Sequence, residues 1–217
     1  MRRFLCFAAL VITVPVMAAT RLAVAPRSVL LLEGSSNVAA WRCRGTTIEG
    51  AMTVDAPLAK INEVVDRIED GNIGVWMSNP AAGSFPAPRF ALSIPIDALR
   101  CSGGRPMERD MKQALEAGQF PAIDFRLGGL RGPIEHDLDA GVYRATIGGE
   151  LALAGVRREL TIPVTAQRIS RTQFRLRAAL PLRMSDFSIV PPTALFGWIK
   201  ADDRLVVDFD LILEAVP

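Results

Sequence analysis

The chain has 217 residues, of which 50% are hydrophobic, and it carries 25 basic and 23 acidic residues. This length suits a single domain. The near balance of charge argues against a nucleic-acid-binding protein, which needs an excess of basic residues to displace the counterions of the phosphates.

Residues 1–18 have the features of a secretory leader. Arg2 and Arg3 supply a positive start, a long apolar run follows, and small or neutral residues end at Ala18. The run is too short for a membrane-spanning helix, and no other run of that length is as apolar. We therefore expect cleavage after Ala18, a single mature domain of residues 19–217, and a periplasmic or secreted protein with no membrane span.

The leader also contains Cys6 and two of the basic residues. Its removal leaves 23 basic and 23 acidic residues and an even number of cysteines. Two cysteines in an oxidising compartment predict one disulfide, between Cys43 and Cys101.

Strand and helix patterns follow one another in the first half of the chain. Three segments are compatible with strands, although their alternation is imperfect: 28–33, 38–44 and 48–54. Apolar residues then recur at three- and four-residue steps over 58–68, after Pro57 and before Gly71, which predicts a helix. Residues 71–88, with three prolines and three glycines, are typical of a loop or an irregular edge.

Two-residue alternation of apolar and polar side chains predominates from residue 90 onward. It predicts five clear strands and a shorter one at 124–128; the five are 90–96, 147–153, 160–164, 174–180 and 205–213. Ala154 and Gly155 predict a hairpin turn, and 106–117 predicts a second short helix that ends at Gly118. Half-buried strands of this kind form antiparallel sheets. We therefore expect a mainly all-β protein whose sheet is closed on itself or packed as two layers.

The sequence offers little for catalysis or metal binding. His136 is the single histidine, and its Gly- and Asp-rich surroundings predict a solvated loop. One histidine without cysteine partners cannot form a structural zinc site, and the sequence has no Gly-x-Ser-x-Gly or phosphate-binding motif. The pairs Asp202/Asp203 and Glu108/Asp110 do not face each other at these spacings. We therefore expect no enzyme activity, no metal and no cofactor.

Several motifs, taken in their order along the chain, resemble those of the YceI-like family. The first covers 94–101 and is followed by a Phe-Pro-x-Ile-x-Phe segment at 120–125. A Gly-x-Leu-x-Leu-x-Gly-Val hairpin follows at 149–156, and Met-Ser-Asp-Phe-Ser-Ile occupies 184–189. The resemblance covers residues 28–214, nearly the whole expected mature chain.

This resemblance implies an extended, lipocalin-like antiparallel β-barrel of about eight strands with two short helices. Characterised members of the family hold a polyisoprenoid or a similar long apolar chain in the barrel. The present chain lacks the histidine–serine pair that typical members carry early in the domain. It has Trp41, Cys43 and Cys101 instead, and so resembles a divergent, disulfide-containing subgroup.

The implied function is that of a non-catalytic carrier or sequestering protein for a long apolar ligand, as a monomer or a homodimer. The inward positions of the predicted strands would line its barrel: Phe90, Leu92, Phe125, Leu127, Leu151, Leu153, Leu160, Ile162, Phe174, Leu176, Val207 and Phe209. The same alternation suits side chains that merely fill a core. An alternative is therefore an envelope interaction or stress protein with a filled barrel and a protein partner. A hydrolase that uses His136 is a third hypothesis.

Two further features concern the polar end of a ligand and its access to the barrel. Most of the arginines that could bind an anionic head group fall on outward strand positions, so none is assigned this role: Arg89, Arg126, Arg144, Arg157, Arg158, Arg175 and Arg177. Residues 187–198, which include Pro191, Pro192, Phe196 and Trp198, predict either a lid or apolar end of the barrel, or a loop packed under it.

Overall fold

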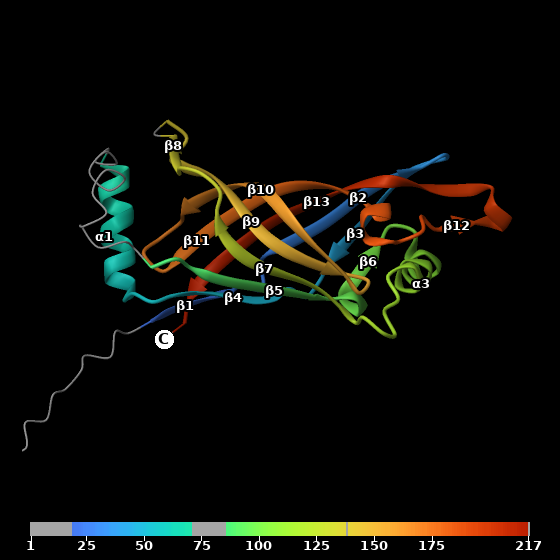
Figure 1. Ribbon diagram of the computed structural model, residues 1–217, viewed down its shortest axis with the longest axis horizontal. Coiled ribbons are helices and arrows are strands. Elements are labelled where there is room, and N and C mark those ends of the chain that lie inside the picture. The colour runs from blue at the N-terminus through green and yellow to red at the C-terminus, as the bar shows by residue number, and fades with distance from the viewer. Residues whose placement is uncertain (1–18, 71–85, 138, 217) are drawn as a thin grey trace, which may run out of the picture.

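A computed structural model describes residues 19–70, 86–137 and 139–216 of the chain. The predicted leader, residues 1–18, and most of the predicted loop, residues 71–85, lie outside the described residues. Within them, an elongated antiparallel β-barrel carries one helix near each end (Figure 1).

Among the described residues, eight antiparallel strands form a closed ring. Their order around the barrel is β1 (Thr20–Val24), β4 (Glu49–Val54), β5 (Arg89–Pro95), β7 (Ala122–Leu130), β9 (Val142–Leu153), β10 (Val156–Arg168), β11 (Gln173–Arg183) and β13 (Ile199–Ala215). β13 pairs with β1 and so completes the ring. The sheet is therefore closed on itself, as the resemblance implied, and the ring presents no free edge for aggregation.

Three more strands extend the barrel wall away from β1: β2 (Val29–Ser36), β3 (Ala40–Gly45) and β6 (Leu99–Cys101). The first half of β13 pairs with β2, and its end pairs with β1, because a turn after Val24 divides one long strand path in two. β3 pairs with β6, and this register places Cys43 directly opposite Cys101. The two sulfurs form the predicted disulfide, with Cα atoms 4.0 Å apart.

The hairpin predicted between β9 and β10 is confirmed. Ala154 and Gly155 have φ angles of 48° and 75°, as a two-residue type I′ turn requires, and Leu153 pairs with Val156. Both strands extend well beyond the predicted 147–153 and 160–164. Long strands of this kind make the barrel deep enough for an extended interior.

Both predicted helices are present, with shifted ends. α1 (Leu58–Glu69) follows Pro57, and α3 (Gly104–Ala114) begins and ends slightly earlier than 106–117. They lie at opposite ends of the barrel (Figure 1). Neither of these described helices has the length and apolar character needed to cross a membrane.

Several short elements were not predicted. They are β1, β6, β8 (Glu135–Asp137), β12 (Thr193–Ala194) and the 3₁₀ turns η2 (Ile96–Ala98), η3 (Met184–Phe187) and η4 (Leu195–Gly197). The prediction of a solvated loop around His136 is wrong, because this residue lies in β8 and pairs with Tyr143 of β9. Its ring stacks on that of Tyr143, with centroids 4.6 Å apart.

The most buried large side chains gather where the short elements meet the barrel. Ile96 of η2, Leu99 of β6 and Phe187 of η3 are each at most 1% exposed. They belong to one hydrophobic cluster with residues of most barrel strands. This solid packing fixes the wall around the hollow part of the interior.

Candidate ligand-binding cavity

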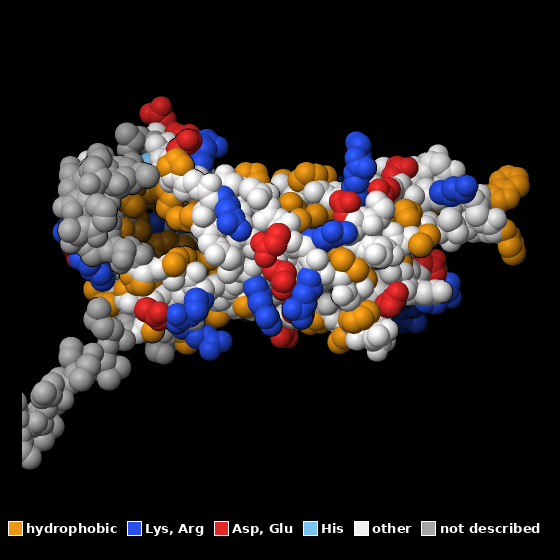
Figure 2. Space-filling view, in the orientation of Figure 1, with side chains coloured by type: hydrophobic (Ala, Val, Ile, Leu, Met, Phe, Trp, Pro, Cys, Tyr) orange, Lys and Arg blue, Asp and Glu red, His pale blue; other side chains and the backbone are white. Residues whose placement is uncertain are grey.

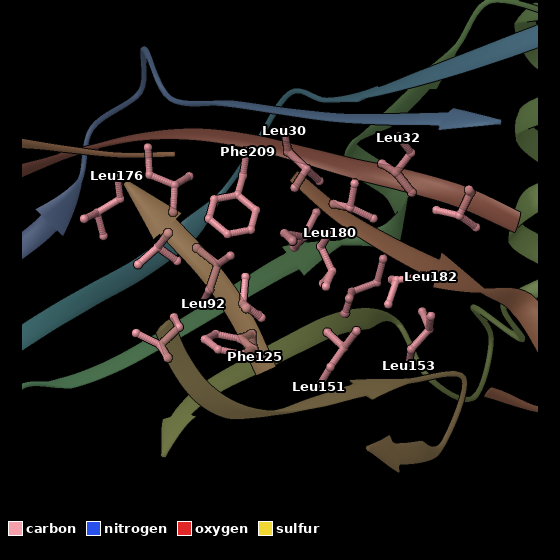
Figure 3. Close-up of a pocket in the computed structure, with 18 of the residues that line it drawn as sticks. Leu30, Leu32, Leu92, Phe125, Leu151, Leu153, Leu176, Leu180, Leu182 and Phe209 are labelled. Carbon is pink, nitrogen blue, oxygen red and sulfur yellow. The ribbon is translucent and has the colours of Figure 1, made fainter. Parts of the chain in front are cut away.

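The barrel encloses an elongated apolar cavity of about 1250 Å³. Leucine and phenylalanine side chains from opposite walls point into a common interior, among them Leu32, Leu92 and Phe209 (Figure 3). The space-filling view shows the barrel hollowed beside α1, with hydrophobic side chains inside the opening (Figure 2). The cavity exceeds the roughly 300–1,000 Å³ of ordinary small-molecule pockets.

The two helices contribute to opposite ends of this cavity. At one end α1 supplies Val64 and Ile68, and at the other α3 supplies Met107 and Met111. The apolar stripe that predicted each helix therefore faces the interior, and it does so at a barrel end rather than along its side (Figure 1). The long axis of the cavity follows that of the barrel.

Eleven of the twelve predicted barrel-interior residues line the cavity: Phe90, Leu92, Phe125, Leu127, Leu151, Leu153, Ile162, Phe174, Leu176, Val207 and Phe209. The exception is Leu160, which packs against the core cluster without lining the cavity. Its partner in the register is Gly149, and a Cβ atom at Gly149 would lie 2.4 Å from the Phe125 ring. The Phe125 ring therefore occupies the interior beside Leu160. Contact of these residues with a ligand stays a prediction.

Other lining residues were missed by the sequence reasoning. Leu30 and Leu32 lie in a segment whose alternation is masked by four consecutive apolar residues, and Leu182 lies beyond the predicted end of its strand. Trp41 also lines the cavity and packs against Gly34, where an added Cβ would clash with the indole. The sequence signal that could have pointed to Trp41 was its position two residues before Cys43.

A polar cluster connects α1 to the barrel at the α1 end of the cavity. Arg168, whose side chain is 16% exposed, donates hydrogen bonds to Asp66 at 2.5 Å and to Glu69. Tyr143 donates to Glu69 at 3.1 Å, and the Asn62 amide donates to the Arg171 carbonyl at 2.8 Å. These bonds hold α1 over the end of the barrel.

The charges of this cluster are mutually satisfied. Hydrogen bonding from Arg168 lowers the pKa of Asp66 below its ordinary value. Burial, together with the neighbouring Glu69 carboxylate, raises the pKa of Tyr143. Asp66 and Glu69 neutralise Arg168, the one cation that lines this end of the cavity within the described residues. The second negative charge is balanced by Arg171, which lies 3.3 Å from Asp66 outside the cavity. The rim formed by Tyr143, Gln167 and Arg168 suits an uncharged polar group better than a free anion.

None of the seven arginines named from the sequence lines the cavity. Five of them form ion pairs on the barrel surface: Arg89 with Asp55, Arg144 with Asp137, Arg157 with Glu150, and both Arg175 and Arg177 with Asp210. Arg175 lowers the pKa of Asp210 through its hydrogen bonds. Two arginines that the sequence reasoning missed, Arg168 and Arg183, do line the cavity.

The carboxylate pairs do not converge on a common point. Asp202 accepts a hydrogen bond from Ser35, whereas its neighbour Asp203 accepts two from Ser185. Glu108 accepts from the Cys101 backbone N–H. Within the described ranges, no three His, Cys, Asp or Glu side chains gather in a way that could hold a metal ion.

The segment 187–198 divides into a buried and an exposed part. Phe187 and Ile189 are 1% and 6% exposed, and Pro192 lines the cavity. Phe196 and Trp198, in contrast, are 105% and 82% exposed. These two residues lie at the apolar end of the barrel opposite α1 (Figure 1), as one prediction allowed. The predictions of a lid and of a loop packed under the barrel are wrong for them, because their side chains extend into solvent.

Comparisons with known proteins agree with the fold. The model of the YceI-like domain family matches residues 38–213. A polyisoprenoid-binding domain from Saccharophagus degradans, implicated in plant cell wall breakdown, superposes with a TM-score of 0.60 at 16% identity, covering 90% of this chain and 98% of that one. BcnA of Burkholderia cenocepacia superposes with a TM-score of 0.55 at 14% identity, covering 86% and 96%. None of the curated proteins compared with the chain matches it. Because the family model spans most of the sequence, the chain belongs to the YceI-like domain family.

Proposed function

We propose that this protein binds one long, apolar, chain-like molecule, such as an isoprenoid, inside its barrel and carries or sequesters it without chemical change. The observation that carries the proposal is the continuous cavity of about 1250 Å³ lined by leucine, isoleucine, valine, phenylalanine and methionine. We further propose that it acts in the periplasm or outside the cell, after removal of residues 1–18.

The shape of the cavity favours a chain over a compact ligand. It extends from α1 to α3 along the barrel, with apolar side chains from every strand of the closed ring except β1. Each methylene group moved from water into such surroundings contributes about 0.8 kcal/mol. A ligand of isoprene units would add this contribution at each step along the tunnel, and its affinity would rise with its length.

The polar rim at α1 indicates which end of the chain would lie there. A hydroxyl or carbonyl group can exchange hydrogen bonds with Tyr143 or Gln167. A phosphate at the same place would approach the Asp66 and Glu69 carboxylates that already bind Arg168. We infer that the ligand either ends in an uncharged polar group at this rim or keeps a charged group outside the barrel.

The similarity to the Saccharophagus degradans domain supports this function, because that protein is described as binding a polyisoprenoid. The rival hypothesis of a solidly filled barrel is not favoured, since the side chains expected to fill the interior leave a cavity of this size. The hypothesis of a hydrolase that uses His136 is not favoured, because its ring stacks on Tyr143 and its buried Nδ1 has no hydrogen-bond partner among the described residues.

Thermal unfolding of the purified protein with added isoprenoid alcohols tests the proposal. A ligand at a hundred times its Kd stabilises a folded protein by about 2.7 kcal/mol. We expect the melting temperature to rise with the number of isoprene units until the cavity is full, and then to stay constant. A melting temperature that no chain length changes would contradict the proposed function.

A further inference from the structure

The end of the barrel opposite α1 carries a protruding apolar hairpin tip. β12 pairs with the start of β13 through Thr193–Lys200 and Ala194–Ile199. The connecting residues Leu195, Phe196 and Trp198 are 66%, 105% and 82% exposed. Two hydrophobic side-chain groups project beyond the rest of the molecule at this end (Figure 2). We define these three residues as the apolar tip.

The backbone holds the tip in an unusual conformation that turns its side chains into solvent. Leu195 and Phe196 have φ angles of 49° and 57°, in the left-handed region that residues with a Cβ rarely adopt. The adjoining β2–β3 turn fixes the hairpin, because the Asn37 amide donates to the Trp198 carbonyl at 2.8 Å and accepts from the Lys200 backbone N–H at 2.8 Å. The fold thus presents two exposed aromatic rings on a braced hairpin.

The base of this hairpin is continuous with the cavity. Thr193, Ala194 and Ile199 of the hairpin line the cavity, as does Ala40 at the start of β3. The α3 residue Met107 lines the same end. An apolar surface therefore runs from the interior to the solvent-exposed tip.

Basic side chains lie at this end of the barrel (Figure 1, Figure 2). Lys200 lies on the hairpin itself, and Arg105 is exposed on α3. Arg109, also exposed on α3, lies 3.4 Å from the Asp110 carboxylate. Asp202 and Asp203 also lie at this end and keep their negative charge while accepting hydrogen bonds from Ser35 and Ser185. Basic residues close to an anionic membrane surface each strengthen binding.

We propose that the apolar tip inserts into the surface of a lipid bilayer and brings the adjacent end of the cavity to the membrane, so that the ligand passes directly between the two. Tryptophan is suited to the membrane interface, where its ring meets both apolar and polar surroundings. A stable protein partner would need about 800 Å² of matched surface on each side, and two projecting rings are too narrow for that. The transfer of a ligand between the membrane and the cavity rests on the proposed function. The docking of the apolar tip on the membrane does not depend on it.

Flotation of the full protein with vesicles of phosphatidylethanolamine and phosphatidylglycerol tests the docking. The variant Phe196→Ser/Trp198→Ser removes both rings from solvent-exposed positions and should leave the fold intact. Its matched control is Ile169→Ser/Val206→Ser, which changes two apolar residues that are 48% and 36% exposed elsewhere on the barrel. Because two exposed aromatic rings are lost, we expect the tip variant to bind these vesicles at least about tenfold more weakly than the native protein, and the control to bind them normally.

The outcomes separate docking from ligand binding. A native protein that stays with the soluble fraction, or a tip variant that floats as well as the native protein, overturns the proposed docking. A dimer in gel filtration that the tip variant dissociates, without any flotation, would also overturn it and assign the tip to a second copy of the chain. The tip variant should keep the thermal shift caused by isoprenoid alcohols. Native protein that floats but shows no such shift leaves docking in place and removes the proposed function instead.

Discussion

Replacing Val207 by tryptophan should divide the cavity in two. Val207 lies between Leu180 of β11 and Leu32 of β2 in the register, and all three line the cavity. An indole at this layer would exclude the part of the ligand that lies beyond it. Excluding only four methylene-sized groups would cost about 3 kcal/mol, which weakens binding by more than about a hundredfold.

This loss has a measurable size in a thermal shift assay. An isoprenoid alcohol at a hundred times its Kd would raise the melting temperature of the native protein by about 5–10 °C. In Val207→Trp the same ligand concentration should raise it by only about 1 °C. Chain length should also stop mattering beyond the number of isoprene units that the shortened cavity accommodates.

The neighbouring residue provides the control. Val206 faces outward and is 36% exposed, so Val206→Trp makes the same substitution outside the cavity and should bind normally. The stability of the unliganded variants tests the cavity itself. A tryptophan forced into a filled core would cost about 1–3 kcal/mol of folding free energy, whereas an empty tunnel has room for the indole ring of Val207→Trp. Equal ligand shifts in both variants, or a large loss of stability in unliganded Val207→Trp, would refute the reasoning.

Three further predictions concern stability. Cys43→Ser/Cys101→Ser should lose about 4 kcal/mol in urea unfolding, since the disulfide closes a loop of 58 residues; an unchanged midpoint would argue against this bond. The pKa of Tyr143 is raised above its ordinary 10.0, so the folded state keeps a proton that the unfolded state loses, and stability should fall as pH rises above that value. Tyr143→Phe should reduce this alkaline loss, and a variant with the same alkaline profile would contradict the assignment. Gly155→Ala should cost at least about 1 kcal/mol, because φ is 75° and the new Cβ would lie 2.4 Å from the Phe120 ring; unchanged thermal unfolding would count against it.

The strands that face the cavity were predictable because their signal is local. Phe90 and Leu92, or Leu151 and Leu153, alternate with polar or small residues, and this period is enough to assign both strand and inward face. The same rule did not reveal Leu30, because the apolar residues around it carry no period. The hairpin turn was also local, since Gly155 supplies a positive φ angle between two runs of alternating residues.

Other features depend on residues that are far apart in the sequence. α1 is held over the cavity by bonds from Arg168 to Asp66 and Glu69, across separations of 102 and 99 residues. Leu160 lies on the inward face of its strand, as predicted, but the Phe125 ring lies between it and the cavity. Gly149 leaves the space that this ring occupies. Neither relation can be derived from periodicity, because each depends on which strands become neighbours in the closed barrel.

Apolar character alone also misplaced the residues of the tip. Phe196 was expected in a lid, at the apolar end of the barrel or in a loop under it, and positive φ angles at two consecutive residues turn it into solvent at that end. Such backbone conformations are not encoded by hydropathy. The exposed tip therefore emerged only from the three-dimensional structure.

The central claim is that the barrel is a hollow container for an apolar chain. Native mass spectrometry of the protein purified from its natural source tests this claim most directly, since it keeps a bound lipid and weighs it. We predict a complex heavier than the polypeptide by the mass of one isoprenoid-like molecule, which organic extraction should release. Folded protein that repeatedly shows only the mass of its own chain, and that takes up no added isoprenoid, would contradict the account.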